Sequence, residues 1–356
     1  MECCMFMSDC KISVIIPVYN SADYLCECLD SLVSQTFNDF EVICINDGST
    51  DNSKEILEEY SNKDIRFNVF SQENSGPAVA RNNAINKAIG EYILFLDSDD
   101  WLKSDTLEKL YSTACSNSSE LVLFNAIEHY KDNITRERIY HIHADETTDF
   151  DEFSFDYNNN INLVMNGYHI VCTKLHKRSF INENNIRFKR YGQFEDIYFH
   201  IKSMICAKRI SYNPEIFYHY RRTQEDSRQN TTISTDKSFV LFSIFDEVEE
   251  LLEEYDLSQK LHINFIRFKV NETYNIFNNI KKEYTDELYK ITYDEFNKMN
   301  LNNEDILRLP LNHQIFYNSI IQSSDYLQYE KLLKKNKILT EFKGYARKLK
   351  NKIMQQ

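Results

Sequence analysis

The sequence predicts an α/β protein in which a doubly wound, mostly parallel sheet is flanked by helices and followed by a helical C-terminal region. Over residues 11–125, short apolar segments alternate with segments of helical spacing, which is typical of a parallel sheet. After about residue 236 only helical spacing is found. Glycine is scarce, with six in 356 residues, and Gly48 and Gly76 fall where a predicted strand ends and a predicted helix begins.

The first part of the chain is expected to hold five strands and four helices. The strands are predicted at 11–16, 40–45, 65–70, 91–96 and 120–124, and the helices at 22–35, 52–60, 77–89 and 104–115. Pro17 is expected to end the first strand. Ligands of such sheets bind at the carboxyl ends of the strands, so we expect Asp47, the turn at 74–77 and Asp97 to converge.

The later part of the chain gives a weaker pattern. We interpret 128–165 as a variable insertion, 171–180 as a strand and turn, 194–206 as a helix, and 210–221 as short strands around Pro214. The inferred organisation is an N-terminal extension (1–10), a domain at 11–230 with halves at about 11–125 and 126–230, and a helical region with a basic tail (231–356).

Charge and hydropathy argue against several classes of protein. The formal net charge of −14 disfavours nucleic acid as a partner. No segment approaches the roughly 18 apolar residues that a membrane-spanning helix needs. Residues 1–10 lack the basic and apolar regions of a secretory signal, so we expect a cytoplasmic protein.

Residues 330–352 form a basic segment in this acidic chain. Nine Lys and Arg residues stand there against two Glu, with Leu, Ile and Phe residues between them. Such a segment is suited to lie on anionic lipid at the inner face of the cell membrane. A solvated terminal helix is an equally good interpretation, and the helical region also leaves room for a homo-oligomer interface.

The segment Asp97-Ser98-Asp99-Asp100 is the strongest indication of chemistry. It follows four apolar residues and precedes the only tryptophan of the chain. Carboxylates placed so closely repel one another, and a cation such as Mg²⁺ or Mn²⁺ relieves this, usually with substrate phosphate as a co-ligand. On an extended chain Asp97 and Asp99 would point the same way. The alternative is a helix start, where acidic residues are common.

Three other segments lie at predicted strand ends or a helix start. Tyr19, in Pro17-Val18-Tyr19-Asn20, could stack on a base. In Asp47-Gly48-Ser49-Thr50-Asp51, the first carboxylate could accept hydrogen bonds from a base or ribose. Residues 74–82 span a turn and a helix start, where anions bind. Arg81 in that segment could reach a phosphate, although a lone arginine is more often solvated on an exposed helix face.

In their order and spacing, these four segments resemble glycosyltransferase family 2, closely over 11–125 and loosely to about 230. The resemblance implies the GT-A fold and a nucleoside-diphosphate sugar donor, most often UDP-linked. It implies that Tyr19 and Asp47 contact the base, that Arg81 and Asp97 contact the nucleotide, and that Asp99 is the direct metal ligand. The donor-binding residues carried over are Pro17, Tyr19, Asn20, Asp47, Ser49, Asn74, Gly76, Arg81, Asp97, Ser98, Asp99, Arg221 and Arg222.

Two further segments match the family after residue 190. The family carries a Glu-Asp pair where this chain has Glu195-Asp196, and its Asp is the usual catalytic base, although acidic residues are also ordinary at a helix start. In the segment 218–222, Arg221 or Arg222 could neutralise the leaving group. His219 is a weaker candidate for a metal ligand beside Asp97 and Asp99.

The resemblance implies an inverting hexosyl- or N-acetylhexosaminyltransferase that uses Mn²⁺ or Mg²⁺. Its acceptor would be a hydroxyl of a glycan or of a lipid-linked compound. One alternative is a non-catalytic scaffold for glycan synthesis that binds nucleotide sugars. Another is a nucleotidyltransferase, which is disfavoured because residues 17–24 contain no Gly, Lys or Arg.

Overall fold

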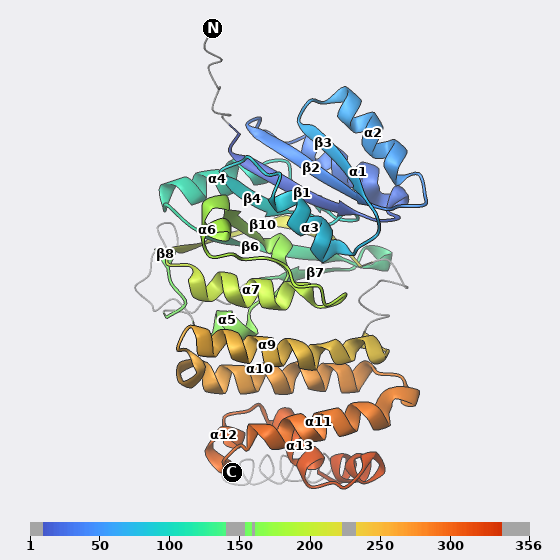
Figure 1. Cartoon of the computed structure of the whole chain (residues 1–356), viewed down its shortest axis with the longest axis vertical. Helices are drawn as coiled ribbons and strands as arrows, with labels where there is room; N and C mark the ends of the chain where they lie inside the picture. Colours follow the sequence, from blue (N-terminus) through green and yellow to red (C-terminus); the bar gives the residue numbers. More distant parts are fainter. Residues whose placement is uncertain (1–9, 140–153, 159–160, 223–232, 337–356) are drawn as a thin grey trace, which may run out of the picture. The chain divides into compact units, whose positions relative to one another are not determined.

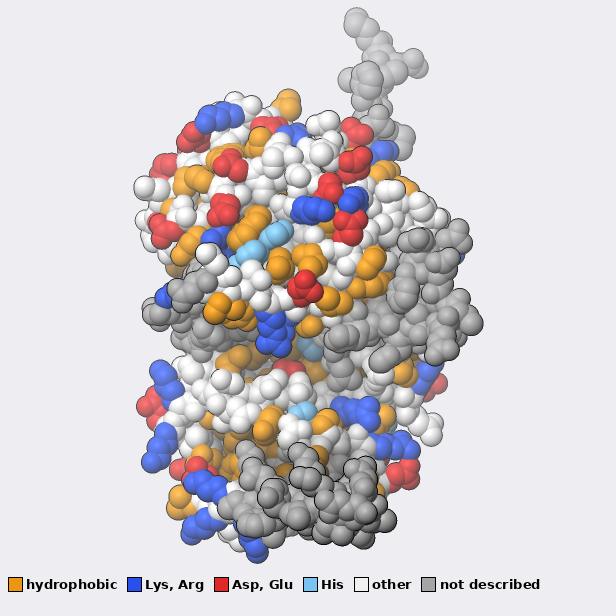
Figure 2. Space-filling model, turned by 180° about the vertical axis from the view of Figure 1, so that it is seen from behind, with side chains coloured by type: hydrophobic (Ala, Val, Ile, Leu, Met, Phe, Trp, Pro, Cys, Tyr) orange, Lys and Arg blue, Asp and Glu red, His pale blue; other side chains and the backbone are white. Residues whose placement is uncertain are grey.

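The computed structural model describes residues 10–139, 154–158, 161–222 and 233–336. The chain divides into two compact units, Met1–Glu225 and Asp226–Gln356 (Figure 1). Within the described residues, no helix combines the length and apolar character needed to cross a membrane. On the face drawn in Figure 2, acidic and basic side chains are interspersed.

The first unit is built on one mixed, mostly parallel sheet, which confirms the predicted fold class. Its strands are ordered β3 (Phe67–Gln72), β2 (Phe40–Asp47), β1 (Ile12–Val18), β4 (Tyr92–Phe95), β9 (Lys174–Lys177), β6 (Leu121–His129), β10 (Ile210–Arg221) and β5 (Trp101–Leu102). The first four strands are mutually parallel, and β9 joins β4 to β6 through antiparallel pairs. The short strands β7 (Thr135–Arg138) and β8 (Ser154–Phe155) pair with β6 and β10.

Helices accompany this sheet (Figure 1). They are α1 (Ala22–Val33), α2 (Ser53–Lys63), α3 (Pro77–Ile85), α4 (Thr106–Ser116), α5 (Asn162–Asn166), α6 (Arg178–Glu183) and α7 (Glu195–Cys206), with 3₁₀ turns η1 (Lys131–Asn133) and η3 (Val171–Thr173). Every residue of β2 and β4 is buried, as expected for central strands of a sheet covered on both faces. The buried residues of β2 include the polar Glu41, Asn46 and Asp47.

Pro17 does not end the first strand, contrary to the prediction. Strand β4 pairs with β1 only as far as Ile15, so beyond that residue β1 has a hydrogen-bonded neighbour on one side alone. A proline lacks one backbone donor and is tolerated where no neighbouring strand requires it. The strand therefore continues through Pro17 to Val18.

Two other expectations about the later part of this unit are also wrong. Residues 210–221 form the single strand β10, which stays paired with β6 through register shifts on either side of Ile216. The shifts accommodate Pro214, as bulges do. The segment 128–165 is not wholly an insertion, because β7, β8 and α5 belong to the folded unit, while 140–153 and 159–160 lie outside the described residues.

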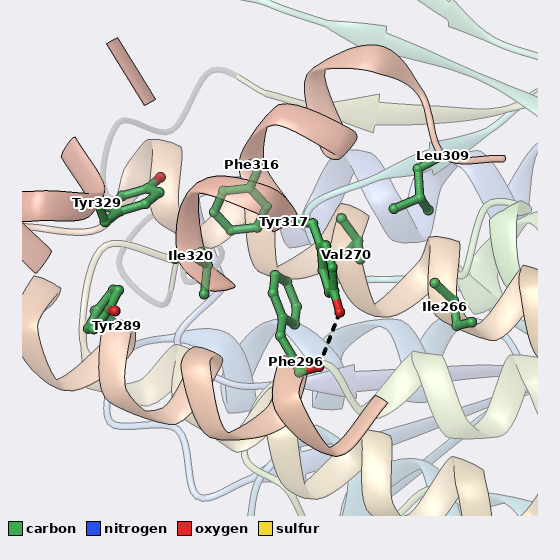
Figure 3. Close-up of a cluster of buried hydrophobic side chains, with 9 residues drawn as sticks. All are labelled: Ile266, Val270, Tyr289, Phe296, Leu309, Phe316, Tyr317, Ile320 and Tyr329. Carbon is green, nitrogen blue, oxygen red and sulfur yellow. Dashed lines mark hydrogen bonds between the residues drawn. The ribbon is translucent and has the colours of Figure 1, made fainter. Parts of the chain in front are cut away.

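The second unit is helical, as predicted. It contains η4 (Asp236–Phe239), α9 (Val240–Glu254), α10 (Ser258–Asn279), η5 (Lys282–Tyr284), α11 (Thr285–Met299), α12 (Asn303–Leu307) and α13 (Leu311–Ile321), and residues 326–336 are also helical. Figure 3 shows how aromatic side chains from these helices meet. Phe296 and Phe316 are fully buried there, with ring centroids 5.6 Å apart at 84°, the edge-to-face geometry that aromatic pairs prefer.

Replacing Phe316 by alanine should destabilise this unit. The ring contacts Tyr274, Phe277, Phe296 and Tyr329, so its removal leaves a cavity and should lower the free energy of unfolding by about 3–5 kcal/mol. Urea unfolding followed by circular dichroism measures this. Leu311→Ala, on the same helix but with 56% of the side chain exposed, should change stability by at most about 0.5 kcal/mol. Equal effects of the two substitutions would contradict the packing described.

Candidate active site

The acidic segment after β4 forms a turn and not an extended strand. The backbone N–H of Asp100 donates to the carbonyl of Asp97 at 3.1 Å, so the predicted alternation of side chains is absent. The side chains of Asp97 and Asp99 therefore have different neighbours: Asp97 pairs with Arg81, and Asp99 lies near Arg221 and Arg222. The hydroxyls of Ser98 and Ser21 lie 2.7 Å apart, which ties this turn to the loop after β1.

Arg81 on α3 joins two acidic side chains from distant parts of the chain. Its Nη2 lies 2.7 Å from Asp97 Oδ1 and its Nη1 lies 3.4 Å from Asp196 Oδ1. The arginine is 6% exposed, so the interpretation of it as a solvated helix residue is wrong. Its Nε is buried without a partner among the described atoms. Asp97 and Asp196 keep 29% and 26% of their side chains exposed, so both carboxylates remain accessible.

Asp196 lies in the first turn of α7, as predicted, beside the buried Glu195. Its Oδ2 accepts a hydrogen bond from the N–H of Val171 at 3.3 Å. Burial raises the pKa of Asp196 to about 6, although the charge of Arg81 opposes the shift. A carboxyl with such a pKa can accept a proton near neutral pH.

The loop after β1 is held against the loop after β2. Asn20 has a left-handed backbone (φ 48°), and its Oδ1 accepts from the N–H of Thr50 at 2.8 Å. The N–H of Asn20 donates to Ser49 Oγ at 3.1 Å, and the N–H of Ala22 donates to an Asp51 oxygen at 3.0 Å. Tyr19 stays 49% exposed beside these contacts, so its ring is available to a ligand.

Asp47 holds the loop that precedes α3. It is 3% exposed, and it accepts hydrogen bonds from Gln72 Nε2 and from the N–H groups of Ser75 and Gly76, each at 2.8 Å. Gly76 has a φ of 86°, which favours glycine. A Cβ at Gly48 would lie 2.9 Å from the backbone nitrogen of Asn74, so glycine is needed there for the two loops to approach.

Asp99 and Asp100 have different environments. Burial, with the charge of Asp97, raises the pKa of Asp99 to about 6. Asp100 is 1% exposed and accepts from the Tyr218 hydroxyl and, at 2.7 Å, from the N–H of Arg221. Asp100 therefore fixes the acidic turn to β10.

Arg221 and Arg222 are engaged within the protein. Arg221 Nε donates to the Asp99 carbonyl at 2.9 Å, and its guanidinium pairs with Glu27 and lies 4.8 Å from the centre of the Trp101 ring. Arg222 pairs at 2.9 Å with Glu128, a carboxylate that is 1% exposed. To reach a diphosphate, either arginine would have to change these partners.

His219 lies in a stack of aromatic rings. Its Nδ1 is 2.9 Å from His129 Nε2, and its ring stacks on Trp101 with centroids 5.2 Å apart. Burial lowers the pKa of His219 to about 4. Within the described parts of the chain, no group of three or more His, Cys, Asp or Glu side chains is arranged to hold a metal ion, so His219 does not join Asp97 and Asp99 in one.

The acidic turn nevertheless fits a divalent cation that also binds substrate. Mg²⁺ and Mn²⁺ are commonly held by one or two carboxylates while phosphate oxygens and waters complete the coordination. Asp99 and Asp97 are two such carboxylates. Burial first, and then the charge of Asp97, raises the pKa of Asp99, and a cation would relieve the repulsion between the two carboxylates.

Several contacts within the site were not predicted from the sequence, although Ser75 and Tyr218 lie in segments that it indicated. Val171, Gln72, Ser75 and Tyr218 each hold one of the acidic side chains. Two of these contacts come from backbone N–H groups, which no side-chain pattern reveals.

Replacing Asp47 by asparagine should loosen the loop before α3. One carboxylate oxygen becomes an NH₂ group, so at least one buried N–H loses its acceptor, at a cost of about 1–3 kcal/mol. Thermal unfolding measures the effect. Asp39→Asn, the same substitution at an exposed position, should leave the melting temperature unchanged, and an equal loss in both variants would disprove the role of Asp47.

Several known proteins are similar to this chain. Residues 13–182 match the model of Glycosyl transferase family 2. The chain is 34% identical over 218 residues to Glycosyltransferase GlyA of Streptococcus pneumoniae, and this match covers 60% of this chain and 31% of GlyA. It is 32% identical over 274 residues to the poly(ribitol-phosphate) beta-glucosyltransferase of Bacillus spizizenii, covering 74% of this chain and 40% of that protein. The chain thus spans less than two thirds of either relative.

A solved structure shares the fold. TarS 1-349 of S. aureus, in complex with UDP-GlcNAc, matches with a TM-score of 0.69 and 24% sequence identity, and the match covers 92% of this chain and 91% of that one. The family match, the curated glycosyltransferase relatives and the fold of TarS lead to one conclusion: residues 13–182 are a glycosyltransferase family 2 domain, and the fold is the GT-A fold.

Proposed function

We propose that this protein transfers a hexosyl or N-acetylhexosaminyl group, with inversion, from a UDP-sugar to a hydroxyl of a glycan or lipid-linked acceptor. The observation that carries this proposal is the pair of contacts made by Arg81. One arginine side chain contacts both Asp97, in the turn expected to face the donor, and Asp196, the expected base. The carboxylate proposed to face the donor and the carboxylate proposed to act on the acceptor therefore both contact the Arg81 guanidinium.

Asp196 is the proposed general base. In a single displacement, the acceptor hydroxyl must lose its proton as its oxygen attacks the anomeric carbon of the sugar. Asp196 keeps about a quarter of its side chain exposed, and its two oxygens are oriented by Arg81 and by the Val171 N–H. Glu195, which is 7% exposed, is less accessible to an acceptor.

Asp99, with Asp97, is proposed to hold Mn²⁺ or Mg²⁺. When bound, such an ion stabilises the negative charge of the leaving diphosphate. Arg221 and Arg222 are proposed to add positive charge at the same side of the site, since Arg221 already lies on the Asp99 backbone. Tyr19 and Asn20, with Asp47 through the loop it holds, are proposed to place the base and ribose.

Named relatives support the choice of substrates. TarS is a poly(ribitol-phosphate) beta-N-acetylglucosaminyltransferase, and its structures include complexes with UDP-GlcNAc and with UDP. A UDP-sugar donor and a cell-surface glycan acceptor are therefore the first to test. Peripheral membrane contact through 330–352 stays a proposal, because 337–352 lie outside the described residues.

Replacing Asp196 by asparagine tests the proposed function. Asparagine keeps the shape but cannot take the proton, so kcat for sugar transfer should fall about 10²–10⁴-fold while UDP-sugar binding changes little. Transfer from a panel of radiolabelled UDP-sugars to glycan and lipid-linked acceptors measures this. The exposed control Asp39→Asn should retain full activity.

The pH profile of the unmodified protein is a second test of Asp196 as the base. Because only the ionised carboxylate acts as base, kcat/KM of the unmodified protein should fall about tenfold per pH unit below about 6 and level off above it. Full activity of Asp196→Asn would exclude Asp196 as the base. UDP-sugar binding without turnover in the unmodified protein would favour the non-catalytic scaffold.

Asp99→Asn tests the proposed metal site without an activity assay. In the unmodified protein, UDP with Mn²⁺ should raise the melting temperature more than UDP alone, because the metal should tighten UDP binding. A ligand present at 100 times its Kd stabilises the folded protein by about 2.7 kcal/mol. The variant should lose the metal-dependent part of this shift and keep the rest. The same metal dependence in both proteins would contradict the role of Asp99.

A further inference from the structure

Lys174 is a buried lysine that the proposed chemistry does not use. It lies on β9, in the middle of the sheet, and is 0% exposed. Its Nζ donates to the carbonyl oxygens of Tyr168 and Ile170, each at 2.7 Å. Lysine is seldom fully buried unless its ammonium is paired, so this one calls for an explanation.

The backbone that Lys174 holds leads directly to Asp196. Ile170 precedes η3, and the next residue, Val171, donates its N–H to Asp196 Oδ2 at 3.3 Å. The other Asp196 oxygen faces Arg81 at 3.4 Å. One oxygen of the carboxylate is therefore oriented from α3 and the other from the segment anchored by Lys174.

Burial disfavours the charged form of Lys174, and Asp196 favours it. The histidines near it are neutral at physiological pH, because burial lowers the pKa of His169 to about 4, of His176 to about 3 and that of His200 well below its usual value. Asp196 and the thiol of Cys172 also interact with Lys174, and burial lowers the pKa of the lysine to about 7. Asp196 itself is also near Arg81, Asp97 and Glu195.

We propose that Lys174 is a positioning residue for Asp196, which fixes the segment 168–171 so that the Val171 N–H holds one carboxylate oxygen in place. This inference rests on the proposed function, in which Asp196 is the base. Lys174 does not contact the substrates. It would keep the carboxylate ionised and aligned for the acceptor hydroxyl.

Two substitutions test this from either end of the contact. Lys174→Met keeps the length of the side chain but removes its charge and its donors. Val171→Pro removes the N–H that reaches Asp196 and replaces a buried valine side chain, and Ile170, with φ −54° and ψ 114°, already has a conformation compatible with a following proline. Position 171 begins η3, where proline is tolerated.

The primary readout is the titration of Asp196 itself. Protein labelled with ¹³C at the aspartate carboxyl groups is titrated by NMR, and the Asp196 resonance is identified by its loss in Asp196→Asn. In both variants the midpoint should rise by about one pH unit, because the ionised form loses a hydrogen bond or a favourable charge. In transfer assays kcat should fall about tenfold while KM for the UDP-sugar stays within about twofold.

The outcomes distinguish this inference from the proposed function. An unchanged midpoint in folded Val171→Pro overturns the positioning role, and this variant decides alone if Lys174→Met does not fold. If Lys174→Met loses UDP binding and turnover equally while the Asp196 midpoint is unchanged, Lys174 has only a structural role. That result also overturns the positioning role. If the unmodified protein transfers no sugar, the proposed function fails, whereas the titration of Asp196 still decides the role of Lys174.

Discussion

The site depends on the buried guanidinium of Arg81. Without it, the negative charges of Asp97 and Asp196 would repel each other with no cation between them. A planar cation with several donors can satisfy two carboxylates in fixed directions, which an ammonium group cannot do equally well. Arg81 is held in turn by α3, whose start is fixed by Asp47 through Ser75 and Gly76. The strand end at Asp47 and the carboxylate of Asp196 are thus connected through one helix.

Acidic residues in this site have separate structural tasks. Asp47 fixes a loop, Asp100 attaches the acidic turn to β10, and Asp97 pairs with Arg81. Only Asp99 and Asp196 combine a raised pKa with proposed chemistry. Their raised pKa values follow from burial beside other negative charges, which is the usual cost of collecting carboxylates in one place.

The sequence predicted the fold and the general place of the site because both follow from local patterns. Strand and helix periodicity over 11–125 was sufficient for the parallel half of the sheet, and strand ends indicated Asp47 and Asp97. The turn at 97–100 was missed because its geometry depends on β10, far along the chain. The ion pair between Glu128 and Arg222 was missed because the two residues are far apart in sequence, and such a pair leaves no local signal.

The pairing of β9 between β4 and β6 has a consequence for how the protein folds. Strands β1, β2 and β3 pair with each other in sequence order, and β4 then joins β1, so the half of the sheet that carries the acidic turn needs no strand after residue 95. The contact between Arg81 and Asp196 spans 115 residues, and closing so long a loop is slow because its entropy is lost before the contact forms. On a ribosome, the N-terminal half of the sheet with Arg81 would therefore exist for seconds before Asp196 has been synthesised.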